Sequence, residues 1–182
     1  TETEVNAAIA AAVPAPVVST TAKVGGTGGG AYDLPCPAGA VAVGLRGRVA
    51  TFEIPGINVV SVACRVVVKG RVVVSLGASS DTDDTGGAQG GGAFNLICPS
   101  GSIMTGVSGM TRNVFGGFAT VVTDLTVHCA NIGTGEASSV GPVHGVANTP
   151  FALTCAAGSH VVGIGPASGD QLLDSLRLKC ST

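Results

Sequence analysis

Six cysteines divide this chain into three similar repeats, and that pattern limits the fold more than any other feature. In each repeat the first cysteine follows an aromatic residue by four positions and a leucine by two, and glycines stand three and eight positions after it. The first cysteines are Cys36, Cys98 and Cys155. The second cysteines are Cys64, Cys129 and Cys180. A short unit of this kind cannot bury its apolar face alone, so we expect the copies to share one core.

The repeat also favours one way of pairing the cysteines, because equivalent repeats should carry equivalent bonds. The predicted disulfides, one within each repeat, are Cys36–Cys64, Cys98–Cys129 and Cys155–Cys180. Each closes a loop of about 25–31 residues, worth about 3–4 kcal/mol in the chain-entropy account of disulfide stabilisation. Disulfides persist in oxidising compartments, and the start at Thr1 without Met indicates a processed form. We therefore expect a secreted or cell-surface, extracellular protein.

Alternating apolar residues predict antiparallel strands in every repeat, and helix signals are nearly missing outside the N-terminal segment. In residues 32–36 the aromatic residue, the leucine and the cysteine fall on one face, which we expect to point inward. The same period marks residues 60–64 before the second cysteine, and residues 65–74 add a hairpin signal with its turn at Lys69-Gly70. The fold class is therefore all-β, with antiparallel strands whose closure by threefold repetition is expected to remove exposed sheet edges.

The chain is predicted to be one β-domain preceded by a short segment of different composition. Residues 1–24 contain no Cys, Gly or aromatic residue, whereas residues 25–182 carry the repeats. The repeats are placed at about 25–84, 85–139 and 140–182.

The N-terminal segment has two interpretations. Apolar residues four apart predict a short helix over residues 5–13, ended by Pro14, and residues 17–24 are expected to be extended. The segment is either a linker or an assembly arm that adds a strand to a neighbouring subunit. The arm residues expected to contact that neighbour are Val17, Thr20 and Ala22.

Composition excludes several partners. Charged residues make up only 11% of the chain and the net charge is −2, so no surface is basic enough to neutralise nucleic-acid phosphates. The chain is apolar on average, yet Gly, Thr, Ser and charged residues interrupt every stretch before it could span a membrane as a helix. We expect the apolar surface to be buried within the fold or between copies of the chain.

The densest acidic cluster is a weak candidate for a metal site. It comprises Asp81, Asp83 and Asp84, in a loop rich in Ser, Thr and Gly. Calcium accepts irregular oxygen ligands, so a calcium-stabilised matrix protein stays a minor alternative. The remaining ligands and the closing Glu of a calcium loop are missing, so a solvated loop is favoured and no metal or cofactor is predicted.

No enzyme is predicted from the titratable residues. His128, His144 and His160 occur in three unlike contexts, and no G-x-S-x-G motif is present. His128 precedes a cysteine on a predicted strand, so it should point outward. The three aromatic residues that do not precede a first cysteine by four positions fall on predicted turns. We favour a packing role for them over contact with a ligand or partner. These residues are Phe52, Phe115 and Phe118.

The glycine clusters before the first strands of repeats one and two resemble a motif of a known family. Residues 25–33 and 86–95 approximate the motif GG-x-GG-x-x-[FY]-[DN] of jacalin-related lectins. The paired cysteines and the threefold repeat also resemble the vitelline membrane outer layer proteins, which share the same β-prism. The resemblance covers about residues 25–182 and implies a threefold pseudo-symmetric β-prism of three antiparallel sheets.

The resemblance also implies a sugar site. Jacalin-related lectins hold sugar between a glycine-rich loop and a G-x-x-x-D loop, whose Asp accepts hydrogen bonds from sugar hydroxyls. The segment Gly169–Asp174 matches this loop with one residue too many, and the equivalent positions in the other repeats hold Asn58 and Thr123 instead of an acid. The candidate glycan-binding residues are Gly169, Asp170 and Asp174, with Asp33 as a second choice.

Two functions follow, in this order. The low charge, high apolarity, disulfides and incomplete sugar motif favour a secreted structural subunit that self-assembles into an extracellular filament or matrix, with other copies of the chain as partners. The alternative is a carbohydrate-binding β-prism lectin, with glycans as partners.

Overall fold

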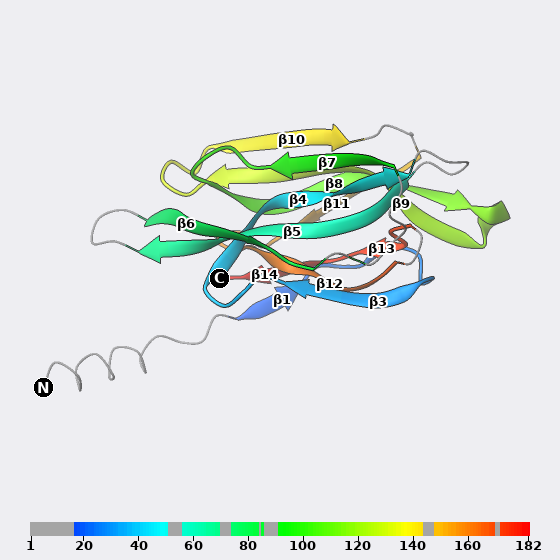
Figure 1. Ribbon diagram of the computed structural model, residues 1–182, viewed down its shortest axis with the longest axis horizontal. Coiled ribbons are helices and arrows are strands. Elements are labelled where there is room, and N and C mark those ends of the chain that lie inside the picture. The colour runs from blue at the N-terminus through cyan, green and yellow to red at the C-terminus, as the bar shows by residue number, and fades with distance from the viewer. Residues whose placement is uncertain are drawn as a thin grey trace, which may run out of the picture.

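The computed structural model is almost entirely β-structure, as the sequence predicts (Figure 1). It describes residues 17–50, 56–69, 74–83, 85, 91–143, 148–169 and 172–182. The predicted helix over residues 5–13 and the turn residue Gly70 lie outside these ranges. The strands are β1 (Val18–Thr20), β2 (Val24–Gly25), β3 (Gly30–Pro35), β4 (Ala40–Ala50), β5 (Gly56–Lys69), β6 (Val74–Asp81), β7 (Gly92–Ile97), β8 (Ser102–Val114), β9 (Ala119–Asn131), β10 (Ala137–Val143), β11 (Thr149–Thr154), β12 (His160–Gly169), β13 (Ser175–Leu176) and β14 (Leu178–Ser181). One 3-10 turn, η1 (Phe115–Gly117), forms the tip between β8 and β9.

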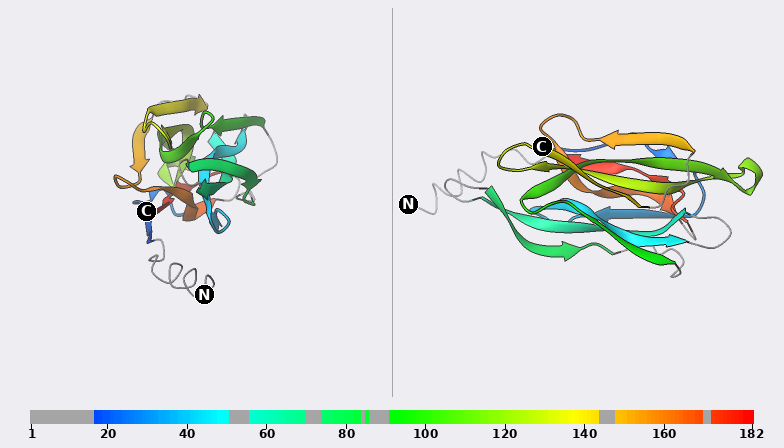
Figure 2. Two further views of the ribbon diagram at one scale, coloured as in Figure 1. Left: turned by 90° about the vertical axis from the view of Figure 1, so that its left-hand side faces the viewer. Right: turned by 90° about the horizontal axis from the view of Figure 1, so that it is seen from above.

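Three four-stranded antiparallel sheets surround one interior, as the view along the long axis shows (Figure 2). The first sheet has the strand order β6-β5-β4-β7, the second β10-β9-β8-β11, and the third β1-β14-β12-β3. Strands β13 and β2 pair separately as a two-stranded ribbon. This arrangement is the β-prism that the family resemblance implies. The expectation that closure removes exposed sheet edges is wrong, because each sheet is open and ends in edge strands such as β1, β6 and β10.

The sheets do not coincide with the sequence repeats, because each repeat gives its opening strand to another sheet. Strand β7 opens the second repeat but pairs with β4 of the first sheet. Strand β11 opens the third repeat but pairs with β8 of the second sheet, and β3 opens the first repeat but pairs with β12 of the third. The three repeats are therefore interlocked by strand exchange.

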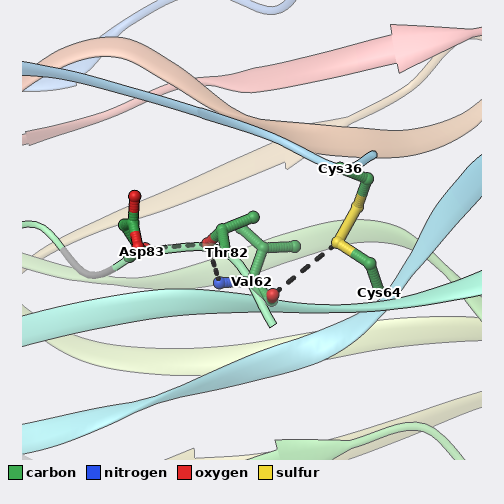
Figure 3. Close-up of a disulfide and its surroundings, with 5 residues drawn as sticks. All are labelled: Cys36, Val62, Cys64, Thr82 and Asp83. Atoms are coloured by element: carbon green, nitrogen blue, oxygen red, sulfur yellow. Dashed lines mark hydrogen bonds between the residues drawn. A yellow bond between two sulfur atoms is a disulfide. The ribbon is translucent and has the colours of Figure 1, made fainter. Parts of the chain in front are cut away.

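The three predicted disulfides are confirmed, and strand exchange turns each of them into a bridge between sheets. Cys36 follows β3 of the third sheet and bonds to Cys64 on β5 of the first (Figure 3). The other two bonds join Cys98 to Cys129 and Cys155 to Cys180, with Cα atoms 5.8 and 5.6 Å apart. The three bonds connect the three sheets pairwise around the prism.

The N-terminal segment completes the prism of its own chain. Strand β1 holds the edge position in the third sheet that β6 and β10 hold in the others, with Thr20 opposite Lys179. The Thr21 amide and hydroxyl bond to the backbone of Leu178, and β2 pairs with β13. The extended conformation expected for residues 17–24 is present, but its strand partner is β14 of the same chain. Val17 and Ala22 remain exposed on either side of β1.

The same tight turn follows each first cysteine. Gly39, Gly101 and Gly158 have φ angles of +75°, +76° and +80°. In the first of these turns the Ala40 amide donates to the Pro37 carbonyl oxygen over 3.0 Å. A positive φ at the third residue is the requirement of a type II turn, which explains why glycine recurs there.

The glycine eight residues after each first cysteine lies where the backbone of the exchanged strand approaches its partner strand closely. A Cβ atom at Gly163 would lie 2.6 Å from the Leu34 carbonyl oxygen, and one at Gly106 would lie 2.7 Å from that of Leu153. At Gly44 the added atom would overlap the Leu96 carbonyl oxygen. The leucine and the glycine of the sequence repeat are thus neighbours across the exchanged strand pairing.

The interior contains the residues that the alternation placed inward. Tyr32 and Phe94 are 8% and 9% exposed, and Phe151 packs against the same cluster. The leucines that follow them are buried as well. The largest fully buried side chains are Leu45, Ile57, Met104, Leu125, Ile164, Leu173, Leu176 and Leu178.

Replacing Gly44 with alanine should destabilise the prism, because its methyl group overlaps the Leu96 carbonyl oxygen of β7. We expect a loss of about 1–3 kcal/mol in the free energy of unfolding, measured by chemical denaturation. The matched control is Gly92→Ala on β7, where an added Cβ meets no atom within 4 Å. Equal denaturation midpoints for the two variants would show that the approach of Gly44 to the Leu96 carbonyl oxygen does not contribute to stability.

Removing β1 and β2 should lower the melting temperature, because their partners β14 and β13 would lose main-chain hydrogen bonds. The comparison is between a chain that begins at Val17 and one that begins at Gly26, both followed by circular dichroism on heating. If the shorter chain melts at the same temperature, the pairing of β1 with β14 contributes nothing to the prism.

Candidate functional site

Loops from three distant parts of the sequence meet at the end of the prism where β13 lies (Figure 1). They are the glycine-rich segment before β3, the β8–β9 tip and the segment before β13. Between them is a hollow of about 250 Å³. It is lined by Gly28, Gly29, Phe115, Ala119, Val121, Leu172 and Asp174. We call it the Gly28–Asp174 hollow.

The segment that carries Asp174 is fixed to the other two repeats by its backbone. The Leu173 amide donates to the Ile57 carbonyl oxygen over 2.6 Å, and the Val122 amide donates to the Leu173 carbonyl oxygen over 2.8 Å. All three side chains are fully buried. Asp174 therefore follows directly after an anchored residue, and its position is well defined.

The glycine-rich segment clamps Asp174 from the other side. The Gly26 amide lies 2.7 Å from the Asp174 carbonyl oxygen and 3.1 Å from that of Thr120. A Cβ atom at Gly25 would overlap the Asp174 carbonyl oxygen, and one at Gly26 would lie 2.8 Å from the Thr120 carbonyl oxygen. Only residues without side chains allow this backbone contact, which is a physical reason for the glycine cluster.

The Asp174 carboxylate lies beside Gly28 at the floor of the hollow. Its residue is 9% exposed, and a Cβ atom at Gly28 would lie 3.3 Å from its Oδ2 atom. Beneath it the Tyr32 hydroxyl donates to the Ser175 carbonyl oxygen over 2.7 Å. Burial, and secondarily the negative charge of Asp174, raise the pKa of Tyr32, so the phenol stays protonated and remains a donor.

Phe115 supplies an exposed aromatic surface at the rim. It is 65% exposed and has a φ angle of +51°, and Phe118 next to it is 94% exposed. The packing role expected for these two residues is wrong, because the β8–β9 tip extends beyond the core. Phe52 lies outside the described residues. The pair of glycines between Phe115 and Phe118 could have indicated an exposed hairpin tip, because both glycines adopt the positive φ angles of a tight turn.

Two of the other predicted glycan residues, Gly169 and Asp33, do not line this hollow. Gly169 ends β12 opposite Gly30, and Asp170 lies outside the described residues. Asp33 is on the outer face of β3, where the Lys179 ammonium lies 2.7 Å from its Oδ2 atom. Asp33 faces a different hollow from Asp174.

The equivalent positions in the other repeats are buried. Asn58 and Thr123 directly follow Ile57 and Val122, the two residues that bond to Leu173. Asn58 is 2% exposed and Thr123 is fully buried. The structure thus places the three residues equivalently, and the one acid among them faces the Gly28–Asp174 hollow.

The acidic cluster is divided among other contacts. Asp81 forms an ion pair with Arg46, and the Asp83 carbonyl oxygen accepts a hydrogen bond from the Thr82 hydroxyl (Figure 3). Asp84 lies outside the described residues. In the parts of the chain that the structure describes, no three His, Cys, Asp or Glu residues are arranged to hold a metal ion.

Two further expectations concern His128 and the membrane. The His128 ring points outward, as expected, with its nitrogens 2.8 Å from the Ser108 hydroxyl and 2.9 Å from that of Ser139. His144 lies outside the described ranges, and His160 opens β12. Among the residues with described positions, no helix has the length and apolarity needed to cross a bilayer.

Comparison with known proteins shows that the chain is similar to solved structures, but not to any family model or curated sequence. A mannose-specific jacalin-related lectin from Morus nigra, solved with mannose, has a TM-score of 0.63 at 16% identity, covering 93% of this chain and 98% of that one. The mannose-binding jacalin-related lectin AcmJRL from Ananas comosus has a TM-score of 0.62 at 18% identity, covering 90% and 96%. Artocarpin, a lectin with mannose specificity, has a TM-score of 0.61 at 19% identity, covering 92% and 100%.

These matches span nearly the whole of both chains, and their low identities mean that they establish the architecture. The three interlocked sheets, the exchanged strands and the full-length superposition lead to the same conclusion. The chain has the β-prism fold of the jacalin-related lectins.

Proposed function

We propose that this protein binds a carbohydrate in the Gly28–Asp174 hollow. The observation that carries the proposal is the position of Asp174, an acid fixed by backbone bonds beside a glycine-rich loop. The structures that match the chain are lectins, and those named above have mannose specificity or bind mannose. We infer a neutral sugar of this kind as the ligand.

The chemistry of the hollow suits a sugar. A carboxylate is an acceptor of charge-assisted hydrogen bonds, and adjacent hydroxyls of a sugar are donors. The glycine residues allow a ligand to approach the backbone closely, and Phe115 offers an apolar ring to the C–H face of a sugar. A volume of about 250 Å³ matches a small ligand better than a long chain.

Carbohydrate binding now ranks above structural assembly. The sequence favoured a self-assembling filament or matrix subunit, and the fold comparisons support the lectin alternative better because their matches are lectins. The likeness to lectins also supports a function other than catalysis. The three disulfides support an oxidising, extracellular location for this activity.

The variant Asp174→Asn should bind mannose at least about tenfold more weakly, because a charged acceptor in a hydrogen bond contributes about 1.5–3 kcal/mol. Affinity is measured by calorimetry with mannose and by glycan array. Phe115→Ala, at an exposed position, should also weaken binding without lowering the melting temperature.

The matched control is Asp33→Asn, which removes an acid that is paired with Lys179 outside the hollow. It should bind mannose like the unmodified protein. Carbohydrate binding at this hollow is ruled out if the unmodified protein binds no glycan on the array, or if Asp174→Asn and Phe115→Ala both bind as tightly as the control.

A further inference from the structure

A second hollow, of about 270 Å³, lies between strands β4, β5 and β6 of the first sheet and the turn that joins β7 to β8. Its polar lining comes from Arg46, Arg65, Ser79, Asp81, Ser100 and Ser102. Neither Gly28 nor Asp174 takes part in it. We call it the Arg65 hollow.

The strand register explains why two arginines meet there. Arg46 on β4 lies opposite Ser61 on β5, and Arg65 stands four residues further along β5. With a period of two, Ser61 and Arg65 share the face opposite to the buried Val62 and Cys64. Ser79 on β6 is the direct cross-strand partner of Arg65.

The two guanidinium groups differ in their partners. Arg46 donates from Nε to Asn95 Oδ1 over 3.0 Å and forms an ion pair with Asp81, so its charge is compensated and its orientation is held. Arg65 is half-buried and lines the same hollow. Within the described ranges, no acid or hydrogen-bond acceptor is paired with its guanidinium.

The hollow therefore carries one uncompensated positive charge beside serine hydroxyls. The surrounding sheet is basic too, because four of the nine Lys and Arg residues lie on β4 and β5 although the chain has a net charge of −2. A guanidinium fork matches the planar oxygen pair of a carboxylate and also binds sulfate oxygens. The serine hydroxyls can bond to the neighbouring hydroxyls of the same ligand.

We propose that the Arg65 hollow binds an acidic saccharide, with its carboxylate or sulfate group on the Arg65 guanidinium. The anion site stands on the geometry of the first sheet alone, and its saccharide character rests on the carbohydrate-binding function proposed above. The protein would then hold a neutral sugar at one end of the prism and an acidic sugar on its side.

The test is calorimetric titration of the full chain with glucuronate, glucose 6-sulfate, glucose and inorganic sulfate. Glucuronate or glucose 6-sulfate should bind, glucose should not bind at this hollow, and binding should weaken as the salt concentration rises. Whichever of the two acidic sugars binds more tightly identifies carboxylate or sulfate as the preferred group. Inorganic sulfate binding as tightly as both acidic sugars would overturn the saccharide assignment.

Arg65→Gln should weaken binding of the acidic sugar at least tenfold, and Arg65→Lys, which keeps the charge but loses the fork, should weaken it less. The matched control is Arg48→Gln, on β4 outside the hollow, which should leave affinity unchanged.

Asp174→Asn should also leave affinity for the acidic sugar unchanged, which separates this site from the Gly28–Asp174 hollow. Equal affinity in Arg65→Gln and the unmodified protein would overturn the proposal, as would loss of acidic-sugar binding in Asp174→Asn. Mannose binding by Arg65→Gln reports on the first hollow alone.

Discussion

The exchange of the opening strand between sheets is the constraint on which the rest of this structure depends. Each sheet contains one strand that comes from a different repeat, so no sheet is complete within a single repeat. The Leu96 carbonyl oxygen of β7 lies close to Gly44 of β4, which allows β7 to pair with the first sheet. Cys98, which follows β7, bonds to Cys129 of its own repeat. In every repeat, the opening strand pairs with a strand of another sheet, and the cysteine that follows it bonds to the repeat's own sheet. Each repeat is therefore held in two sheets. The three disulfide loops restrict the unfolded chain, and the three sheets that they connect enclose a core of mostly aliphatic side chains.

The same exchange assembles the candidate sugar site. Strand β3 leaves the first repeat and pairs with β12 of the third, which carries the glycine-rich segment before β3 to the backbone of Asp174. The β8–β9 tip of the second repeat completes the rim with Phe115. A site built from three repeats has two pseudo-equivalents in a threefold prism. Those positions hold Asn58 and Thr123, so the symmetry of the fold is retained while the acid occurs once.

Local patterns predicted the parts of the fold that depend on a repeating period. The disulfide pairing and the inward face of the strands follow from equivalence and alternation, and both are observed. Strand exchange was not predictable, because the pattern within a strand does not say which strand lies beside it. For the same reason the sequence did not show that Thr20 pairs with Lys179, or that Lys179 neutralises Asp33 at a separation of 146 residues. The exposure of Phe115 and Phe118 was missed because composition cannot tell how far a hairpin tip extends beyond the core.

Mapping the disulfides by mass spectrometry of the unreduced, proteolysed protein tests the disulfide framework of the prism most directly. The account predicts three linked peptide pairs, Cys36 with Cys64, Cys98 with Cys129 and Cys155 with Cys180, and no free thiol. Each pair joins neighbouring sheets only if the opening strands are exchanged. A bond between cysteines of different repeats, or a substantial fraction of free thiol, would contradict the three bridges between sheets and the site geometry that depends on them.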